Sequence, residues 1–164
     1  MSKRKMIILA AIILLLVVFG IVFRPDEEVE GEREVFLYFS DQEAMYLEPE
    51  TRVVSEEDIL YNTVNELITG PQETSLLKTI PEGVVVKEII LEGNTAEINF
   101  NNALLEEHWG GSTGERITIY SIVNTMTQFE EIVEVKILIE GHEIETLGHM
   151  DLRQPLTPSR DLIQ

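Results

Sequence analysis

A run of 18 residues without a charged or polar side chain, at residues 6–23, constrains this chain more than any other feature. As an α-helix at 1.5 Å per residue, the run would be about 27 Å long, which is close to the thickness of a membrane's hydrocarbon core. A cleaved secretory signal usually ends in small residues, and the residues leading up to Phe23 contain no such cleavage site. The sequence therefore predicts an uncleaved transmembrane anchor over residues 6–23.

The charges on either side of the run predict its orientation. Lys3, Arg4 and Lys5 precede the run, and every acidic residue of the chain follows it. By the positive-inside rule, residues 1–5 are expected in the cytoplasm and everything after the anchor outside it. The expected localisation is therefore the cell membrane, in a single-pass protein with an extracytoplasmic domain.

Composition excludes several classes of function. Of the 12 basic residues in the chain, 9 follow the run, where they face 30 acidic residues and leave a net charge of −21. A surface of this charge repels phosphate groups, so nucleic acid is excluded as a partner. The chain contains no cysteine, which excludes disulfides, thiolate nucleophiles, thiolate metal sites and lipid anchors on a thiol.

The remaining chain is expected to hold one domain between two polar segments. Residues 24–34 are predicted to be an acidic linker, because six of the nine residues at positions 26–34 are acidic. Residues 151–164 are predicted to be a flexible tail, since they are largely polar and contain Pro155 and Pro158. This leaves residues 35–150 for a folded domain with one core.

The first half of the domain is expected to form strands followed by a helix. A buried strand is predicted at residues 35–39, and shorter strands at residues 46–47 and 52–54. Ser55 is the expected N-cap of a helix, with Asp58 completing a pair that resembles a capping box. The helix should end at Gly70-Pro71 and bury a stripe made of Leu60, Val64, Leu67 and Ile68.

The second half is expected to form a hairpin, a helix and further strands. Gly93-Asn94 should turn a hairpin of residues 84–91 and 95–100, and Ser112 with Glu115 should open the second helix. Residues 133–140 alternate strictly, with Val133 among the inward residues, and a last strand is expected at residues 143–147. Because the alternation places polar residues on one face of the sheet, that face should be exposed to solvent, and both helices should lie on the other face. The predicted fold class is α+β, a two-layer sandwich of one mixed sheet with two helices on one face.

Several stretches of this pattern resemble the GerMN domain family over residues 35–147. The most specific is Ile122-Val123-Asn124-Thr125-Met126-Thr127-Gln128-Phe129 with the strand Val135-Lys136-Ile137-Leu138-Ile139-Glu140-Gly141; others are Leu67-Ile68-Thr69-Gly70-Pro71, Ile80-Pro81-Glu82-Gly83 and Glu97-Ile98-Asn99-Phe100. The resemblance implies a non-enzymatic extracytoplasmic module of spore-forming bacteria, similar in fold to the ring-building domains of envelope-spanning channels. Family members are commonly lipoproteins with two domain copies, whereas this chain has no cysteine and room for one copy. Similar domains also occur in bacteria that do not sporulate.

A search for catalytic or metal-binding chemistry starts from the three histidines. His149 and Asp151 could supply two metal ligands, but no third ligand stands at a suitable spacing. Ser112 and His108 lack the surroundings of a nucleophile elbow, and the adjacent acids Glu106 and Glu107 point apart on any regular element. No catalytic residue, metal site or cofactor is therefore expected.

The segment 101–111 is the strongest candidate for a binding surface. It contains the only tryptophan of the chain, Trp109. Leu104, Leu105, His108 and Trp109 could form an apolar patch for a partner, or they could form a short helix that covers the edge of the core. A second expected contact is the strand edge at His142 and Ile144, because an unpaired edge can accept another chain.

The function expected from these observations is that of a membrane-anchored interaction or assembly module in the sporulation or germination envelope machinery. Its expected partners are other envelope or sporulation-channel proteins, or further copies of itself confined in the membrane. Two alternatives remain open: a ligand-binding or signal-relay module of general envelope physiology, and a cell-wall hydrolase.

Overall fold

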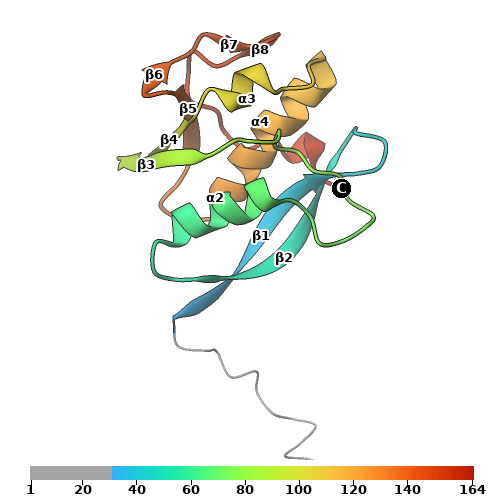
Figure 1. Cartoon of the computed structure of the whole chain (residues 1–164). Helices are drawn as coiled ribbons and strands as arrows, with labels where there is room; N and C mark the ends of the chain where they lie inside the picture. The colour runs from blue at the N-terminus through green and yellow to red at the C-terminus, as the bar shows by residue number, and fades with distance from the viewer. Residues whose placement is uncertain (1–30) are drawn as a thin grey trace, which may run out of the picture. The chain divides into compact units, whose positions relative to one another are not determined.

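The computed structural model describes residues 31–164 (Figure 1). Within this range no helix combines the length and the apolar character required to cross a membrane. The predicted cytoplasmic segment, the anchor over residues 6–23 and most of the predicted linker lie outside the described residues. The elements are β1 (Glu32–Ser40), β2 (Leu47–Ser55), α2 (Ile59–Thr69), β3 (Val86–Glu92), β4 (Thr95–Phe100), α3 (Ala103–Glu106), α4 (Ser112–Met126), β5 (Glu134–Ile139), β6 (His142–Glu143), β7 (Thr146–Leu147), β8 (Met150–Asp151) and a 3-10 turn, η1 (Arg160–Leu162).

The strands within residues 31–164 form three sheets, so the prediction of one mixed sheet is wrong. The largest sheet has the order β3-β4-β5-β6, in which β4 and β5 are parallel and the other pairs antiparallel. β1 and β2 form a separate antiparallel hairpin, and β7 and β8 form another. The α+β class and the mixed character of the main sheet are as expected.

The hairpin of β1 and β2 stays separate because α4 occupies the edge of β1. Gln128, just after α4, accepts a hydrogen bond from the backbone N–H of Phe36 and donates one to its carbonyl oxygen, both at 2.8 Å. The backbone N–H of Tyr38 donates to the hydroxyl of Thr125 at 3.1 Å. These side chains take the place of a neighbouring strand, so the edge of β1 is satisfied without joining the main sheet.

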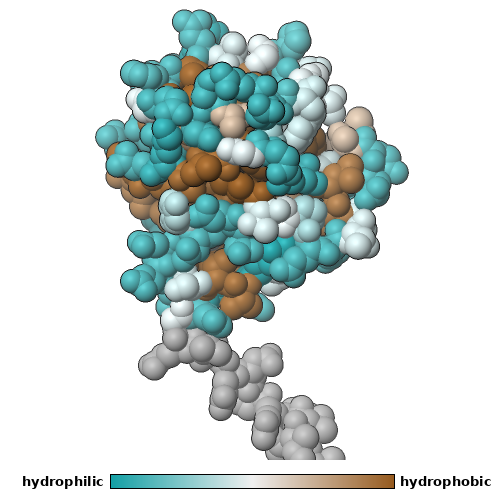
Figure 2. All heavy atoms as spheres, in the orientation of Figure 1, coloured by the Kyte–Doolittle hydropathy of each residue, from teal (hydrophilic) through white to brown (hydrophobic). Residues whose placement is uncertain are grey.

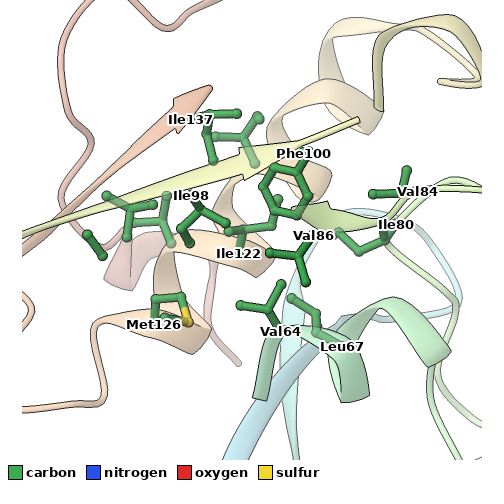
Figure 3. Packing of buried hydrophobic residues seen from close by; sticks show 14 of the residues in the cluster. Val64, Leu67, Ile80, Val84, Val86, Ile98, Phe100, Ile122, Met126 and Ile137 are labelled. Atoms are coloured by element: carbon green, nitrogen blue, oxygen red, sulfur yellow. The ribbon is translucent and has the colours of Figure 1, made fainter. Parts of the chain in front are cut away.

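The main sheet buries one face, as its alternation predicts. In β4 and β5 every second residue is buried, and this face packs with α2 and α4 in one core (Figure 3). Val133 is an exception, since it is 54% exposed although an inward position was expected. The regular strand begins only at Glu134, so the alternation does not extend back to Val133.

α4 is buried around most of its circumference, which explains its weak amphipathic pattern. Ten of its 15 residues are buried, and they include polar residues such as Ser121 and Thr125. The helix contacts the hairpin on β1, the main sheet and the C-terminal residues. A helix surrounded in this way requires hydrogen-bonding partners for its polar side chains, and the hydroxyl of Ser121 donates to the carbonyl of Thr118 at 2.9 Å.

A buried ion pair ties the hairpin to the end of α2. Arg52 in β2 donates to a carboxylate oxygen of Glu50 at 2.6 Å, to Glu66 of α2 at 2.8 Å and to the carbonyl of Gly70 at 2.9 Å. The Glu50 carboxylate also accepts hydrogen bonds from the backbone N–H groups of residues 72 and 73. Arg52 and Glu50 are both buried, so this network replaces the water that their charges have lost.

α2 begins later than the sequence predicts. Its N-cap is Asp58, in a left-handed conformation with φ 55°, and not Ser55. Ser55 is the last residue of β2 and pairs with Glu32, so its backbone is held in an extended conformation. The Ser55 hydroxyl instead accepts a hydrogen bond from the N–H of Glu57. The pairing of Glu32 also shows that β1 begins inside the predicted linker.

The prediction of a flexible tail over residues 151–164 is wrong. The backbone groups of Leu156 and Val135 exchange two hydrogen bonds, at 2.8 and 2.9 Å, on β5. Asn124 of α4 holds the backbone of Ser159 through two further hydrogen bonds. Leu162 is buried against a small second core. The segment has the polar composition of a tail, but Leu156, Leu162 and the distant Asn124 hold it on the domain.

Candidate functional site

The segment 101–111 forms a short helix followed by an exposed loop. α3 buries Leu104 completely and Leu105 in part, so the helix covers the edge of the core. Leu104 is thus unavailable to a partner, and the hypothesis of a patch that includes it is wrong. The side chain of Asn101 fixes the start of the segment, because it accepts from the N–H of Val85 at 3.0 Å and donates to the carbonyl of Gly83 at 2.9 Å.

Trp109 is the exposed aromatic residue of this loop. Its side chain is 54% exposed and stacks on the ring of His108, with ring centres 5.0 Å apart and planes inclined by 25°. The indole lies against the first turn of α4, where a Cβ atom at Gly114 would come within 2.8 Å of the indole nitrogen. The small size of Gly114 therefore lets the indole rest on the helix.

His108 fixes the loop through both ring nitrogens. The backbone N–H of Gly110 donates to Nδ1 at 2.9 Å, so Nδ1 carries no proton. Nε2 then carries the proton and donates to the hydroxyl of Thr118 at 3.1 Å, and this hydroxyl donates to the carbonyl of Thr79 at 2.7 Å. The chain of hydrogen bonds holds the neutral form of His108 in one orientation.

Burial lowers the pKa of His108 below 6.5, although the nearby carboxylate of Glu115 acts in the opposite direction. Protonation of Nδ1 would also remove the acceptor for the N–H of Gly110. The folded loop therefore favours the neutral ring. Its stabilising contribution is present above the ordinary pKa of histidine and is lost as the pH falls through the lowered pKa.

We expect acid to release this loop before the domain unfolds. As the pH falls below 6.5, protonation of His108 should break the contact with Gly110, and the emission of Trp109, the only tryptophan, should shift toward that of exposed indole. A fluorescence titration of the full chain measures this transition. The variant His108→Gln should lose it, and His142→Gln, which changes an exposed histidine, should keep it. A transition that persists in His108→Gln would show that another group controls the loop.

His142 and Ile144 lie at the other predicted contact, beyond β5. His142 is exposed in β6, where it pairs with Ile139, and Ile144 is half-buried against the main core. In the described part of the chain, no hydrogen bond or ion pair joins either residue to Trp109. The two predicted contacts therefore belong to different elements, namely the loop after α3 and the strand β6 with the residue that follows it.

Glu115 has a role that its sequence position does not reveal. The capping box expected at Ser112 is absent, because Gly111 is the N-cap and Ser112 the first helical residue. The buried carboxylate of Glu115 instead accepts the backbone N–H of His149 at 2.7 Å. This hydrogen bond lowers the pKa of Glu115 more than burial raises it. Glu115 thereby ties the turn between β7 and β8 to α4.

The catalytic hypotheses find no support in this geometry. The ring nitrogens of His108 bind Thr118 and Gly110, so they do not activate Ser112. Glu106 and Glu107 are exposed neighbours on the short helix and its end. Among residues 31–164, no group of three histidines or acids is placed to hold a metal ion.

The order α2-β3-β4-α4-β5, with both helices packed on the buried face of a mixed sheet, defines a small α+β domain class. A family model described as Germane, sporulation and spore germination, matches residues 36–145. The chain belongs to this family, whose domain is the GerMN domain, and the resemblance noted in the sequence is confirmed.

Solved structures agree with this assignment. The tandem GerMN domains of the sporulation protein GerM from Bacillus subtilis superpose with a TM-score of 0.66 at 22% identity, covering 77% of this chain and 46% of that one. This chain thus spans about half the length of the tandem protein. The first GerMN domain of the same protein gives a TM-score of 0.63 at 23% identity, covering 79% and 98%. At these identities the likeness is one of fold.

A third structure, a candidate lipoprotein from Clostridium perfringens, gives a TM-score of 0.55 at 25% identity and covers 82% of this chain and 93% of that one. No curated protein sequence matches the chain.

Proposed function

We propose that this chain is a membrane-anchored, extracytoplasmic assembly module that works without catalysis in the sporulation or germination machinery of the cell envelope. The observation that carries the proposal is the exposed Trp109, which stacks on His108 and lies against Gly114, on a domain of the GerMN family. A tryptophan that is already fixed loses little conformational freedom on binding, and tryptophan is enriched among residues that dominate protein interfaces.

The proposed location depends on the N-terminal sequence. The apolar run over residues 6–23 and the basic residues before it support a single-pass anchor with the domain outside the cytoplasm. The description of a structural relative as a candidate lipoprotein is consistent with envelope attachment by a different anchor.

The proposed assembly depends on confinement in the membrane. The net charge of −21 after the anchor opposes contact between copies, so the free domain should be monomeric in dilute buffer. Anchoring raises the effective concentration of the domain, so a weak contact through Trp109 suffices to recruit an envelope protein or further copies into a ring. The resemblance to the GerMN family implies a fold similar to the ring-building domains of envelope channels, and those domains are our model for the proposed arrangement.

Cross-linking in cells tests the proposal. A membrane-impermeant cross-linker added to intact cells during sporulation should capture the chain with a partner, because the domain is outside the membrane. Trp109→Ala should reduce that species at least about tenfold, a loss in the range for a central interface tryptophan. Ile144→Glu probes the second predicted contact in the same way.

Met45→Ala is the matched control, because Met45 is 54% exposed, like Trp109, but lies in the turn between β1 and β2. It should leave the cross-linked species unchanged. If Trp109→Ala and Ile144→Glu both leave it unchanged while the domain stays folded, neither surface is the interface. Capture of the same species in growing, non-sporulating cells would favour a general envelope role.

A further inference from the structure

An open groove of about 620 Å³ lies between the beginning of α2 and strand β3. Its apolar wall consists of Ile59, Leu60 and Tyr61 from α2 and Ile89 from β3. Tyr61 is 43% exposed there. Figure 2 shows a hydrophobic band over the part of the molecule where Figure 1 places α2 and β3. We call this feature the α2–β3 groove; it is separate from the loop of Trp109.

The groove exists because α2 is too short to cover the buried face of the sheet. Ile89 pairs with Ile98, and Leu91 pairs with Ala96, so both side chains lie on the face that carries the core. Ile98 and Ala96 are completely buried, whereas Ile89 is only half-buried and Leu91 is 42% exposed. The late start of α2 at Ile59 leaves this end of the sheet uncovered.

The rim of the groove is acidic. Glu56 and Asp58 come from the segment before α2, and Glu131 comes from the segment after α4. Among residues 31–164, no basic side chain lines the groove. An apolar wall between three carboxylates is complementary to a large apolar side chain flanked by lysine or arginine. The carboxylates also make entry of an acidic segment unfavourable.

We propose that the α2–β3 groove binds a basic segment of a partner protein, with an apolar side chain against Tyr61 and Ile89 and basic side chains on the rim carboxylates. The inference rests on the proposed binding role and names the chemistry of one partner. A second copy of this chain fits poorly, because the residues after the apolar run include 9 basic and 30 acidic residues, so the acidic rim would repel it.

Fluorescent peptides test the proposal by anisotropy titration of the full chain in detergent micelles. The probe is the capped peptide Lys-Lys-Leu-Phe-Lys-Lys, compared with Glu-Glu-Leu-Phe-Glu-Glu and Lys-Lys-Ser-Ser-Lys-Lys. The first should bind, the acidic peptide should not, and the polar basic peptide should bind at least about tenfold more weakly because it lacks the apolar contact. Raising the salt concentration from 0.1 to 0.5 M should weaken binding several-fold by screening.

Isosteric neutralisation identifies the site. The triple variant Glu56→Gln, Asp58→Asn and Glu131→Gln should bind the probe about tenfold more weakly, since three exposed ion pairs are lost. The matched control removes the same charge from exposed residues elsewhere, through Glu43→Gln, Glu106→Gln and Glu107→Gln, and should bind normally. Tyr61→Ala should weaken binding several-fold.

Four outcomes would overturn the proposal. Equal losses in the two triple variants, or equal binding of both basic peptides, would reduce the interaction to general charge attraction. Association of the chain with itself that the rim variant abolishes would place a second copy in the groove. Stronger peptide binding after replacement of Lys3, Arg4 and Lys5 by serine would make the chain's own N-terminus the occupant.

Trp109→Ala should leave peptide affinity unchanged, because Trp109 does not line the groove. Failure of the Trp109 interface and failure of the groove are therefore separate results.

Discussion

Replacing Arg52 with alanine is expected to lower the free energy of unfolding by about 3–5 kcal/mol, the range measured when one partner of a buried ion pair is removed. The guanidinium binds Glu50, Glu66 and the carbonyl of Gly70 in a buried position. Its loss leaves the Glu50 carboxylate buried with only two backbone N–H donors. Urea denaturation of the full chain in detergent, followed by circular dichroism, measures the effect.

The pH dependence of this loss gives a second check. Burial alone raises the pKa of Glu50, but the backbone hydrogen bonds from residues 73 and 72 and the pair with Arg52 outweigh it and hold the pKa below 4.5. In the native protein this group therefore adds stability above pH 4.5, which is lost as the pH falls through its lowered pKa. In Arg52→Ala, acid neutralises the stranded carboxylate. The difference between the two proteins should therefore shrink as the pH falls from 7 toward 4.

Arg153→Ala is the matched control for Arg52→Ala. Arg153 donates to Asp151 at 2.6 Å, but both side chains are more than half exposed. This exposed pair should contribute less than about 1 kcal/mol. Equal losses in the two variants would mean that the Arg52 network does not hold the hairpin to α2.

Gly148→Ala is expected to lower the free energy of unfolding by about 2–4 kcal/mol, from left-handed strain and overpacking combined. Gly148 has φ 55°, and a Cβ atom there would lie 2.0 Å from a carboxylate oxygen of Glu115. That carboxylate is buried and bound to the N–H of His149, so it cannot swing away without losing its hydrogen bond. Thermal unfolding of the full chain, with calorimetric enthalpies, measures the change.

Gly141→Ala separates the two contributions. Gly141 also has a positive φ, 79°, but a Cβ atom there would meet no atom within 4 Å. This variant should therefore show only the left-handed strain, about 1 kcal/mol. If Gly148→Ala costs no more than Gly141→Ala, the turn yields easily and Glu115 does not anchor it.

The elements whose conformation is set by residues close together in the sequence could be predicted from the sequence. The hairpin at Gly93-Asn94 and the one-sided burial of β4 are confirmed, because turn chemistry and a period of two are local properties. The family resemblance could be recognised for the same reason, since its motifs are contiguous stretches. The match of the family model to residues 36–145 confirms it. The start of α2 was missed because the pairing of Ser55 with Glu32 is not a local property.

Within the candidate site, Trp109 could be identified from the sequence, because it is the only tryptophan and lies in the segment 101–111. The hydrogen bonds that hold its loop could not be predicted. Thr118 and Thr79 are 39 residues apart in sequence and meet only in the folded domain. The burial of Leu104 and the role of Glu115 depend on the same packing of distant segments. Sequence patterns identify an apolar or acidic residue, but they do not reveal which distant group it contacts.

The sequence by itself determined the class of the domain, the approximate positions of β3, β4 and β5 and the net charge, because periodicity and composition are properties of adjacent residues. The tertiary structure decided which strands share a sheet, how the C-terminal residues are anchored and where apolar surface stays open. Gln128 closing the edge of β1, 92 residues away, is the clearest case. Contacts of this kind form only when the chain packs, since their free energy comes from burying groups that no local pattern brings together.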